Sequence, residues 1–175
     1  MKYYAFIRGI NVGGNTKVDM TLLKKEVARK YSIQMDSYLN SGNLIIESSI
    51  DKNRVVEIIK ENIRELFSVE TEVIIKTRQE LEEALENNPF RHTEGIDPSH
   101  LIICFLSKPV GSDAIQKIKA NDRIIEPLGV KDDILYIHYV NGIARSKLTT
   151  GYIDRVLGLS STGRNMNTIE GLLKK

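Results

Sequence analysis

The sequence has few of the residues that stabilise small secreted folds or cross membranes. Its 175 residues include one cysteine, four prolines and no tryptophan. A single cysteine excludes an intramolecular disulfide framework. The apolar runs, such as residues 101–106, are far shorter than the about 20 residues that a membrane-spanning helix needs. The amino end shows no signal-peptide pattern, so we expect a soluble protein of the reducing cytoplasm that makes no membrane contact.

Excess charge of one sign is also lacking. The chain has 25 Lys and Arg against 23 Asp and Glu, which leaves a formal net charge of +2. A dedicated nucleic-acid binder is expected to carry a broad basic field, and this balance does not supply one. Any anion-binding site must therefore be local. The length suits one domain of ordinary size or two small lobes.

The first half of the chain alternates strand and helix patterns. Apolar and β-branched residues predict strands at 3–10, 35–40, 44–47 and 69–77, and apolar residues at helical spacing predict helices at 20–31 and 51–67. Asp19 and Asp51 are the expected N-caps. The order is β-α-β-β-α-β. This is the split βαβ arrangement of ferredoxin-like domains, in which both helices lie on one face of an antiparallel sheet.

The second half repeats most of this order. Strands are predicted at 100–106, 123–127 and 134–139, and helices at 112–119, 148–158 and 166–175. The polar stretch 160–165 is expected to be a loop, which makes the second lobe an incomplete copy of the first.

The predicted fold class is therefore α+β, with two ferredoxin-like lobes, antiparallel or mixed sheets, and helices packed on one face. We expect a first lobe over 1–78, an acidic helix and loop over 79–99, and a second lobe over 100–175 that ends in a closing helix.

The first glycine-rich loop, residues 8–17, resembles part of a phosphate-binding loop. Gly9 and Gly14 have the right spacing, but the Lys-Ser/Thr pair that must follow the second glycine is missing, so an ATPase is excluded. The glycines could instead form a backbone nest for an anion, with Arg8 and Lys17 close by. The alternative is an ordinary turn that needs positive φ at Gly13 and Gly14.

Three further polar segments are candidates for the same role. The first is Asn40-Ser41-Gly42-Asn43, which is otherwise a plain hairpin turn and which the topology could bring close to the first loop. The others, 142–148 and 160–168, run into predicted helices. Ser146 is a candidate cap for one of these helices, and Asn165 or Thr162 for the other, while Lys147 and Arg164 would favour an anion there.

Other catalytic chemistry finds little support. Ser146 and Lys147 are adjacent, so their side chains diverge and cannot form a nucleophile–base pair. Cys104 lies within an apolar run, where a thiol behaves as a small hydrophobic group. The three histidines have no metal-ligand spacing. We therefore expect no metal and no cofactor, and no catalytic residue is nominated.

Several of these motifs together resemble one family. They are Arg8-Gly9-Ile10-Asn11-Val12-Gly13-Gly14 with Lys17 and Met20, Tyr38-Leu39-Asn40-Ser41-Gly42-Asn43, Asn88-Pro89-Phe90, Ser146-Lys147, and Thr162-Gly163-Arg164-Asn165-Met166-Asn167-Thr168. They closely resemble the domain-of-unknown-function 1697 family over nearly the whole chain. Gly163 and Met166 differ from the residues that are more common at these positions of the family's motif. The resemblance implies a bacterial cytosolic protein with two α/β lobes, and it implies no activity.

The leading hypothesis is a cleft between the two lobes that binds a small phosphate- or carboxylate-bearing ligand. The expected ligand-binding residues are Arg8, Asn11, Gly13, Gly14, Lys17, Asn40, Ser41, Gly42, Asn43, Ser146, Lys147, Thr162, Arg164 and Asn165. One alternative is a protein–protein interaction module that uses the Glu-rich helix 80–86 or an exposed sheet edge. Another is an RNA or single-strand binder with Tyr3, Tyr38 or Tyr136 as stacking platforms.

Overall fold

The computed structural model describes residues 1–12 and 16–175. The chain divides into two compact units, Met1–Gln79 and Glu80–Lys175. Within the described residues, each unit contains a four-stranded sheet in which every strand pair is antiparallel. The predicted α+β class is therefore confirmed. No helix in this part of the chain combines the length and apolar character that crossing a bilayer requires.

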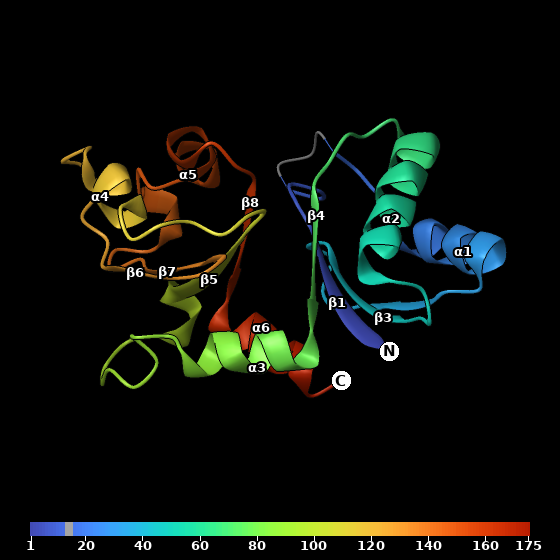
Figure 1. Ribbon diagram of the computed structural model, residues 1–175, viewed down its shortest axis with the longest axis horizontal. Coiled ribbons are helices and arrows are strands. Elements are labelled where there is room, and N and C mark those ends of the chain that lie inside the picture. The colour runs from blue at the N-terminus through green and yellow to red at the C-terminus, as the bar shows by residue number, and fades with distance from the viewer. Residues whose placement is uncertain (13–15) are drawn as a thin grey trace. The chain divides into compact units, whose positions relative to one another are not determined.

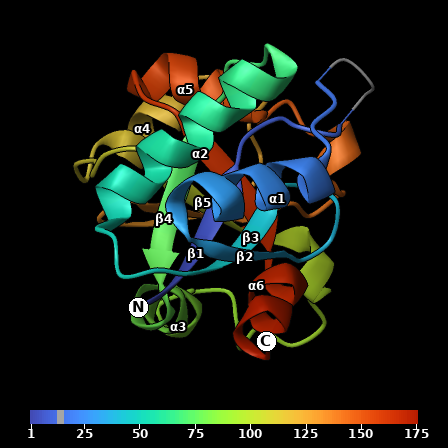
Figure 2. The same cartoon turned by 90° about the vertical axis from the view of Figure 1, so that its right-hand side faces the viewer.

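The first unit places two helices on one face of its sheet (Figures 1 and 2). Its elements are β1 (Lys2–Ile7), α1 (Met20–Tyr31), β2 (Gln34–Ser37), β3 (Asn43–Glu47), α2 (Lys52–Phe67) and β4 (Val73–Thr77). The strand order is β2-β3-β1-β4, so β1 is hydrogen-bonded on both sides. Because a central strand faces neighbours on both edges, its buried apolar sequence fits this position.

Local sequence accounts for both helices of the first unit. The carboxylate of Asp19 accepts from the backbone N–H of Thr21 and Leu22, and Asp51 caps α2 in a similar way. The apolar stripes of the two helices meet alternate residues of β1 in one core, which includes Leu23, Val27, Val55, Ile59, Tyr3, Ala5 and Ile7. Tyr3 therefore belongs to the core and is not an exposed platform for a stacked base.

The second unit has the same strand order, with β5 in the central position. Its elements are β5 (Leu101–Leu106), α4 (Ala114–Lys119), β6 (Leu128–Lys131), β7 (Ile134–His138), α5 (Thr150–Leu157), β8 (Ser161–Asn165) and α6 (Met166–Leu173), with short 3₁₀ helices η1 (Pro98–His100) and η2 (Ile143–Arg145). Helix α3 (Arg78–Glu86) starts at the end of the first unit. Strand order β6-β7-β5-β8 places β8 where β4 lies in the first unit.

The prediction of an incomplete second lobe is wrong, because residues 161–165 form a fourth strand. Strand β8 pairs antiparallel with β5, and Gly163 lies opposite Cys104. Its polar side chains give no strand pattern in the sequence. The backbone of β5 nevertheless has donors and acceptors on this edge that must be paired, and β8 supplies the partners whatever its side chains are.

The predicted strand at 123–127 is also wrong, since the strand begins later, at Leu128. Pro127 has no N–H with which to extend the ladder. Pairing with β7 starts at the Pro127 carbonyl, which accepts from the backbone N–H of His138. Residues 123–127 instead form an irregular segment in which Ile124 and Glu126 are buried.

Of the two described glycines in the first unit, Gly42 is the one whose backbone is closely approached by a neighbouring segment. Its φ is +77°, and a Cβ at this position would lie 2.8 Å from the carbonyl oxygen of Ile7. The Gly42 carbonyl also accepts from the N–H of Ile7. We expect Gly42→Ala to lower the free energy of unfolding by about 2–4 kcal/mol, from backbone strain plus the clash. Urea denaturation followed by circular dichroism measures this loss.

Gly9→Ala is the matched control for that substitution. Gly9 also has a positive φ, of +62°, but nothing lies within 4 Å of a Cβ placed there. Its variant should lose only the conformational part, about 1–2 kcal/mol. Equal losses at the two glycines would show that the contact with Ile7 contributes nothing.

Candidate functional site

The loop after β1 and the turn between β2 and β3 are joined by the side chain of Asn11. Its Nδ2 donates to the carbonyls of Val18 and Asn40, at 3.1 and 3.2 Å. Its Oδ1 accepts from the N–H of Val18 at 3.0 Å. Asn11 has φ of +57°, a conformation that asparagine tolerates better than most residues. The two loops therefore meet, as the topology suggested, and the amide of Asn11 is used to hold them together.

The Ser-Gly-Asn turn is also internally bonded. Asn43 is fully buried, and its Nδ2 donates to the Tyr38 carbonyl at 2.9 Å and to Ser41 Oγ at 3.1 Å. Gly42 is the close-approach glycine described above. Asn40 and Ser41 are exposed. Gly42 and Asn43 were expected to bind a ligand. In the structure both instead stabilise the backbone of this turn.

Arg8, at the start of the first loop, lies beside acidic residues. Arg8 lines a surface hollow of about 420 Å³ together with Gly9, Glu70, Thr71 and Glu72. Two glutamates next to one arginine give this hollow no cationic excess. Lys17 is exposed and does not line it. Gly13 and Gly14, including the expectation that each has a positive φ, lie outside the described residues.

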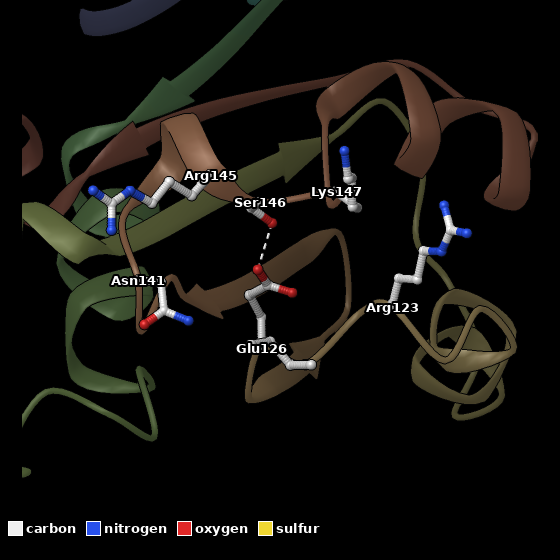
Figure 3. Close-up of a pocket in the computed structure, with 7 residues that line it drawn as sticks. Arg123, Glu126, Asn141, Arg145, Ser146 and Lys147 are labelled. Atoms are coloured by element: carbon white, nitrogen blue, oxygen red, sulfur yellow. Dashed lines mark hydrogen bonds between the residues drawn. The ribbon is translucent and has the colours of Figure 1, made fainter.

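The second unit contains a more clearly cationic cavity, of about 360 Å³ (Figure 3). Two segments form it: residues 123–126, which precede β6, and residues 141–147, which follow β7. The lining residues are Arg123, Ile125, Glu126, Asn141, Arg145, Ser146 and Lys147. Of these, the sequence pointed only to Ser146 and Lys147.

Buried anchors hold the two segments in place. Ile124 and Leu148 belong to the core of the second unit. The Tyr139 hydroxyl donates to the Leu148 carbonyl at 2.8 Å. Burial, and then the neighbouring Cys104 and Glu126 side chains, raise the pKa of Tyr139 above its ordinary value, so this hydroxyl keeps its proton. These buried contacts therefore fix the positions of the two segments that form the cavity.

Glu126 is the buried acidic residue of the cavity, with 4% of its surface exposed. The Ser146 hydroxyl donates to its Oε1, as the dashed line in Figure 3 marks. Ser146 Oγ in turn accepts from the backbone N–H of Leu148 at 2.9 Å. The other carboxylate oxygen, Oε2, is buried and has no hydrogen-bond partner among the described residues. A carboxylate with one unsatisfied oxygen is costly to bury.

Three cationic side chains line the same cavity as this carboxylate. Arg123, Arg145 and Lys147 are exposed and form no ion pair within the described part of the chain. Figure 3 shows Arg145 and Lys147 directed away from Glu126. The lining therefore carries three positive charges against one negative charge, and the cations are available to an anion.

Ser146 does not cap a helix, contrary to expectation. The N-cap of α5 is Thr149, whose Oγ1 accepts from the N–H of Tyr152. Ser146 lies at the end of η2, too far upstream, and its hydroxyl is committed to Glu126. Asn165 does cap α6, since its Oδ1 accepts from the N–H of Thr168 at 2.9 Å.

The expected ligand-binding residues on β8 do not line this cavity. Thr162 is buried, and Arg164 Nη1 donates to Thr162 Oγ1 and to the Gly163 carbonyl, each at 2.8 Å. Burial lowers the pKa of Arg164 to about 10, so it still carries its charge at neutral pH. Strand β8 lies at the sheet edge opposite β6, and this separates it from the segment that holds Glu126.

Sequence reasoning missed Arg123, Glu126, Asn141 and Arg145. The available signal was the acidic residue in the otherwise apolar run Ile124-Ile125-Glu126-Pro127-Leu128. An unpaired acid among apolar residues indicates either a turn or a buried functional carboxylate. Interpreting the run as a strand concealed both possibilities.

The fold is shared with a solved protein. The structure described as "conserved bacterial protein SP0830 from Streptococcus pneumoniae" superposes with a TM-score of 0.70 at 24% sequence identity, covering 99% of this chain and 97% of that one. At this identity the likeness shows the fold alone. The sequence matches none of the curated proteins with which it was compared.

Family membership follows from the sequence match. The family described as "Protein of unknown function (DUF1697)" matches residues 1–136, which is most of the chain. The protein belongs to this family, as its motifs indicated. The match includes Arg123 and Glu126 but ends before the segment that contains Ser146.

Removing the Asn11 amide tests its role in joining the two loops. Asn11→Ala deletes three hydrogen bonds, and we expect a loss of about 1–3 kcal/mol in the free energy of unfolding. Asn40→Ala is the control, because Asn40 contributes only its backbone carbonyl; its change should stay within about 0.5 kcal/mol. Chemical denaturation measures both, and a neutral Asn11→Ala would contradict the role.

The lowered pKa of His138 predicts that the stability of the protein depends on pH. Partial burial, and then the neighbouring His100, lower the pKa of His138. The unfolded chain therefore binds a proton more readily than the folded one, and stability falls as the pH drops below about 6.5 through the folded pKa. His138→Gln should flatten this fall in thermal-denaturation profiles between pH 7.5 and 5. His92→Gln, in an exposed loop, should leave the profile unchanged.

Proposed function

We propose that the second unit binds a small phosphate- or carboxylate-bearing ligand in the cavity lined by Arg123, Arg145 and Lys147. The observation that carries this proposal is the set of three exposed, unpaired cations on one small cavity. Elsewhere on the described surface, charged side chains often stand in pairs, such as Lys60 with Glu72 and Lys117 with Asp113. Cations without partners are free to contact an anion without first breaking an ion pair.

The dimensions of the cavity support a small ligand. A volume of about 360 Å³ lies at the lower end of the roughly 300–1,000 Å³ found for small-molecule sites. Asn141 adds an amide that can donate or accept, and Ile125 adds an apolar wall. A binding function needs no nucleophile or base, and this proposal assigns no reaction to the site.

The scaffold supports the same interpretation. We classify both units as ferredoxin-like, because each inserts the second strand of its hairpin, β3 or β7, between the two strands of a βαβ unit. In such a fold the loops at the strand ends are free to vary while the sheet stays fixed. Both walls of the cavity are loop segments next to β6 and β7.

Site-resolved NMR titration tests the proposal. Inorganic phosphate and citrate, added to the full chain, should shift the amide signals of residues 123–126 and 141–148. Arg145→Ala and Lys147→Ala should each raise the dissociation constant roughly three- to tenfold, and added salt should weaken binding.

Lys131→Ala is the matched control, because Lys131 is an exposed cation of the same unit that does not line the cavity. It should leave the dissociation constant unchanged. An equal effect of Lys131→Ala would indicate non-specific attraction and overturn the proposal, as would shifts confined to other parts of the chain.

A further inference from the structure

We infer that the ligand of this cavity carries a hydrogen-bond donor, a hydroxyl or ammonium group, in addition to its anionic group, and that the donor is recognised by Glu126. This inference rests on the proposed function and narrows the class of ligand. It follows from the unsatisfied oxygen of the buried carboxylate, not from the three cations that line the same cavity.

The hydrogen bonds around Glu126 leave one acceptor open. Ser146 has a single hydroxyl proton, which it donates to Oε1, and its oxygen accepts from the Leu148 N–H. Ser146 therefore has no second proton for Oε2. No other described residue donates to Oε2, although the carboxylate has capacity for several donors.

The nearby cations do not fill this role. Arg145 and Lys147 extend away from the carboxylate in Figure 3, and both are solvated. Their position on the rim suits the anionic group of a ligand, whereas Oε2 lies deeper, out of contact with solvent. Glu126 itself lines the cavity, and the terminal torsion of a glutamate is broad, so rotation of the carboxylate can present Oε2 to a ligand there. A donor that enters the cavity then satisfies it.

The site thus pairs a positive rim with an acceptor at its base. A simple anion would satisfy the rim and leave Oε2 unpartnered. A ligand with both groups satisfies the rim and the base together, and a donor to an ionised carboxylate forms a strong, charge-assisted hydrogen bond. The cavity should therefore discriminate between phosphate esters of nearly equal shape that differ only in their terminal group.

Three phosphate monoesters of nearly equal shape test the inference: propyl phosphate, 2-hydroxyethyl phosphate and 2-aminoethyl phosphate. Their terminal groups are methyl, hydroxyl and ammonium, which also separates the two kinds of donor. Isothermal titration calorimetry with the full chain should give a dissociation constant about tenfold lower for the better donor ester than for propyl phosphate.

Glu126→Gln is the decisive variant because it keeps the shape of the side chain. Its amide oxygen can accept from Ser146, which places an NH₂ donor where Oε2 was. The tenfold preference should disappear while propyl phosphate still binds. Lys147→Ala should weaken the binding of all three esters by a similar factor and leave the preference for the donor ester unchanged.

The outcomes separate this inference from the proposed function. Equal binding of all three esters by the unsubstituted protein overturns the inference and leaves anion binding intact. A preference that survives Glu126→Gln also overturns it, because another group must then recognise the donor. No binding of any ester at millimolar concentration overturns the proposed function itself.

Discussion

Both units depend on a central strand that is hydrogen-bonded along both edges. Strand β1 lies between β3 and β4, and β5 lies between β7 and β8. With both edges paired, the backbone of such a strand can be buried at no cost in unsatisfied groups, and apolar side chains can fill both of its faces. Every residue of β5 is buried, as are the last five of β1. The helices and the loops take their positions from these two strands.

The register of the central strands decides which loops meet. Phe6 lies opposite Asn43 in the ladder between β1 and β3, so the loop that leaves β1 must pass beside the Ser-Gly-Asn turn. Asn11 then joins the two loops through one side chain. An asparagine amide suits this position because it donates and accepts at once. Much of the family-like signature of the first unit is therefore explained by loop architecture.

The cavity of the second unit differs from these loops, because one of its buried polar atoms has no hydrogen-bond partner among the described residues. Glu126 is buried, and only one of its carboxylate oxygens is satisfied within the described residues. Folded proteins pair nearly all of their buried polar groups, and the exceptions occur where strain or function keeps them. The proposed binding role would account both for this oxygen and for the three unpaired cations that line the same cavity.

Local patterns in the sequence were sufficient for the α+β class, the amphipathic helices α1 and α2, their Asp caps and the strand β5, because period and capping are properties of neighbouring residues. They failed for β8, where a polar segment becomes a strand only because an edge of β5 must be paired, and for residues 123–127, where Pro127 ends the ladder.

Ser146 and Lys147 were found from their loop composition. Glu126 and Arg123 lie about 20 residues before Ser146 and Lys147 in the chain. No local pattern shows that these two segments meet in the folded protein. The sequence by itself determined the helices and the apolar strands. The tertiary structure decided where the polar strand β8 forms and which loops meet, because strand pairing and the burial of a carboxylate depend on contacts between residues far apart in the chain.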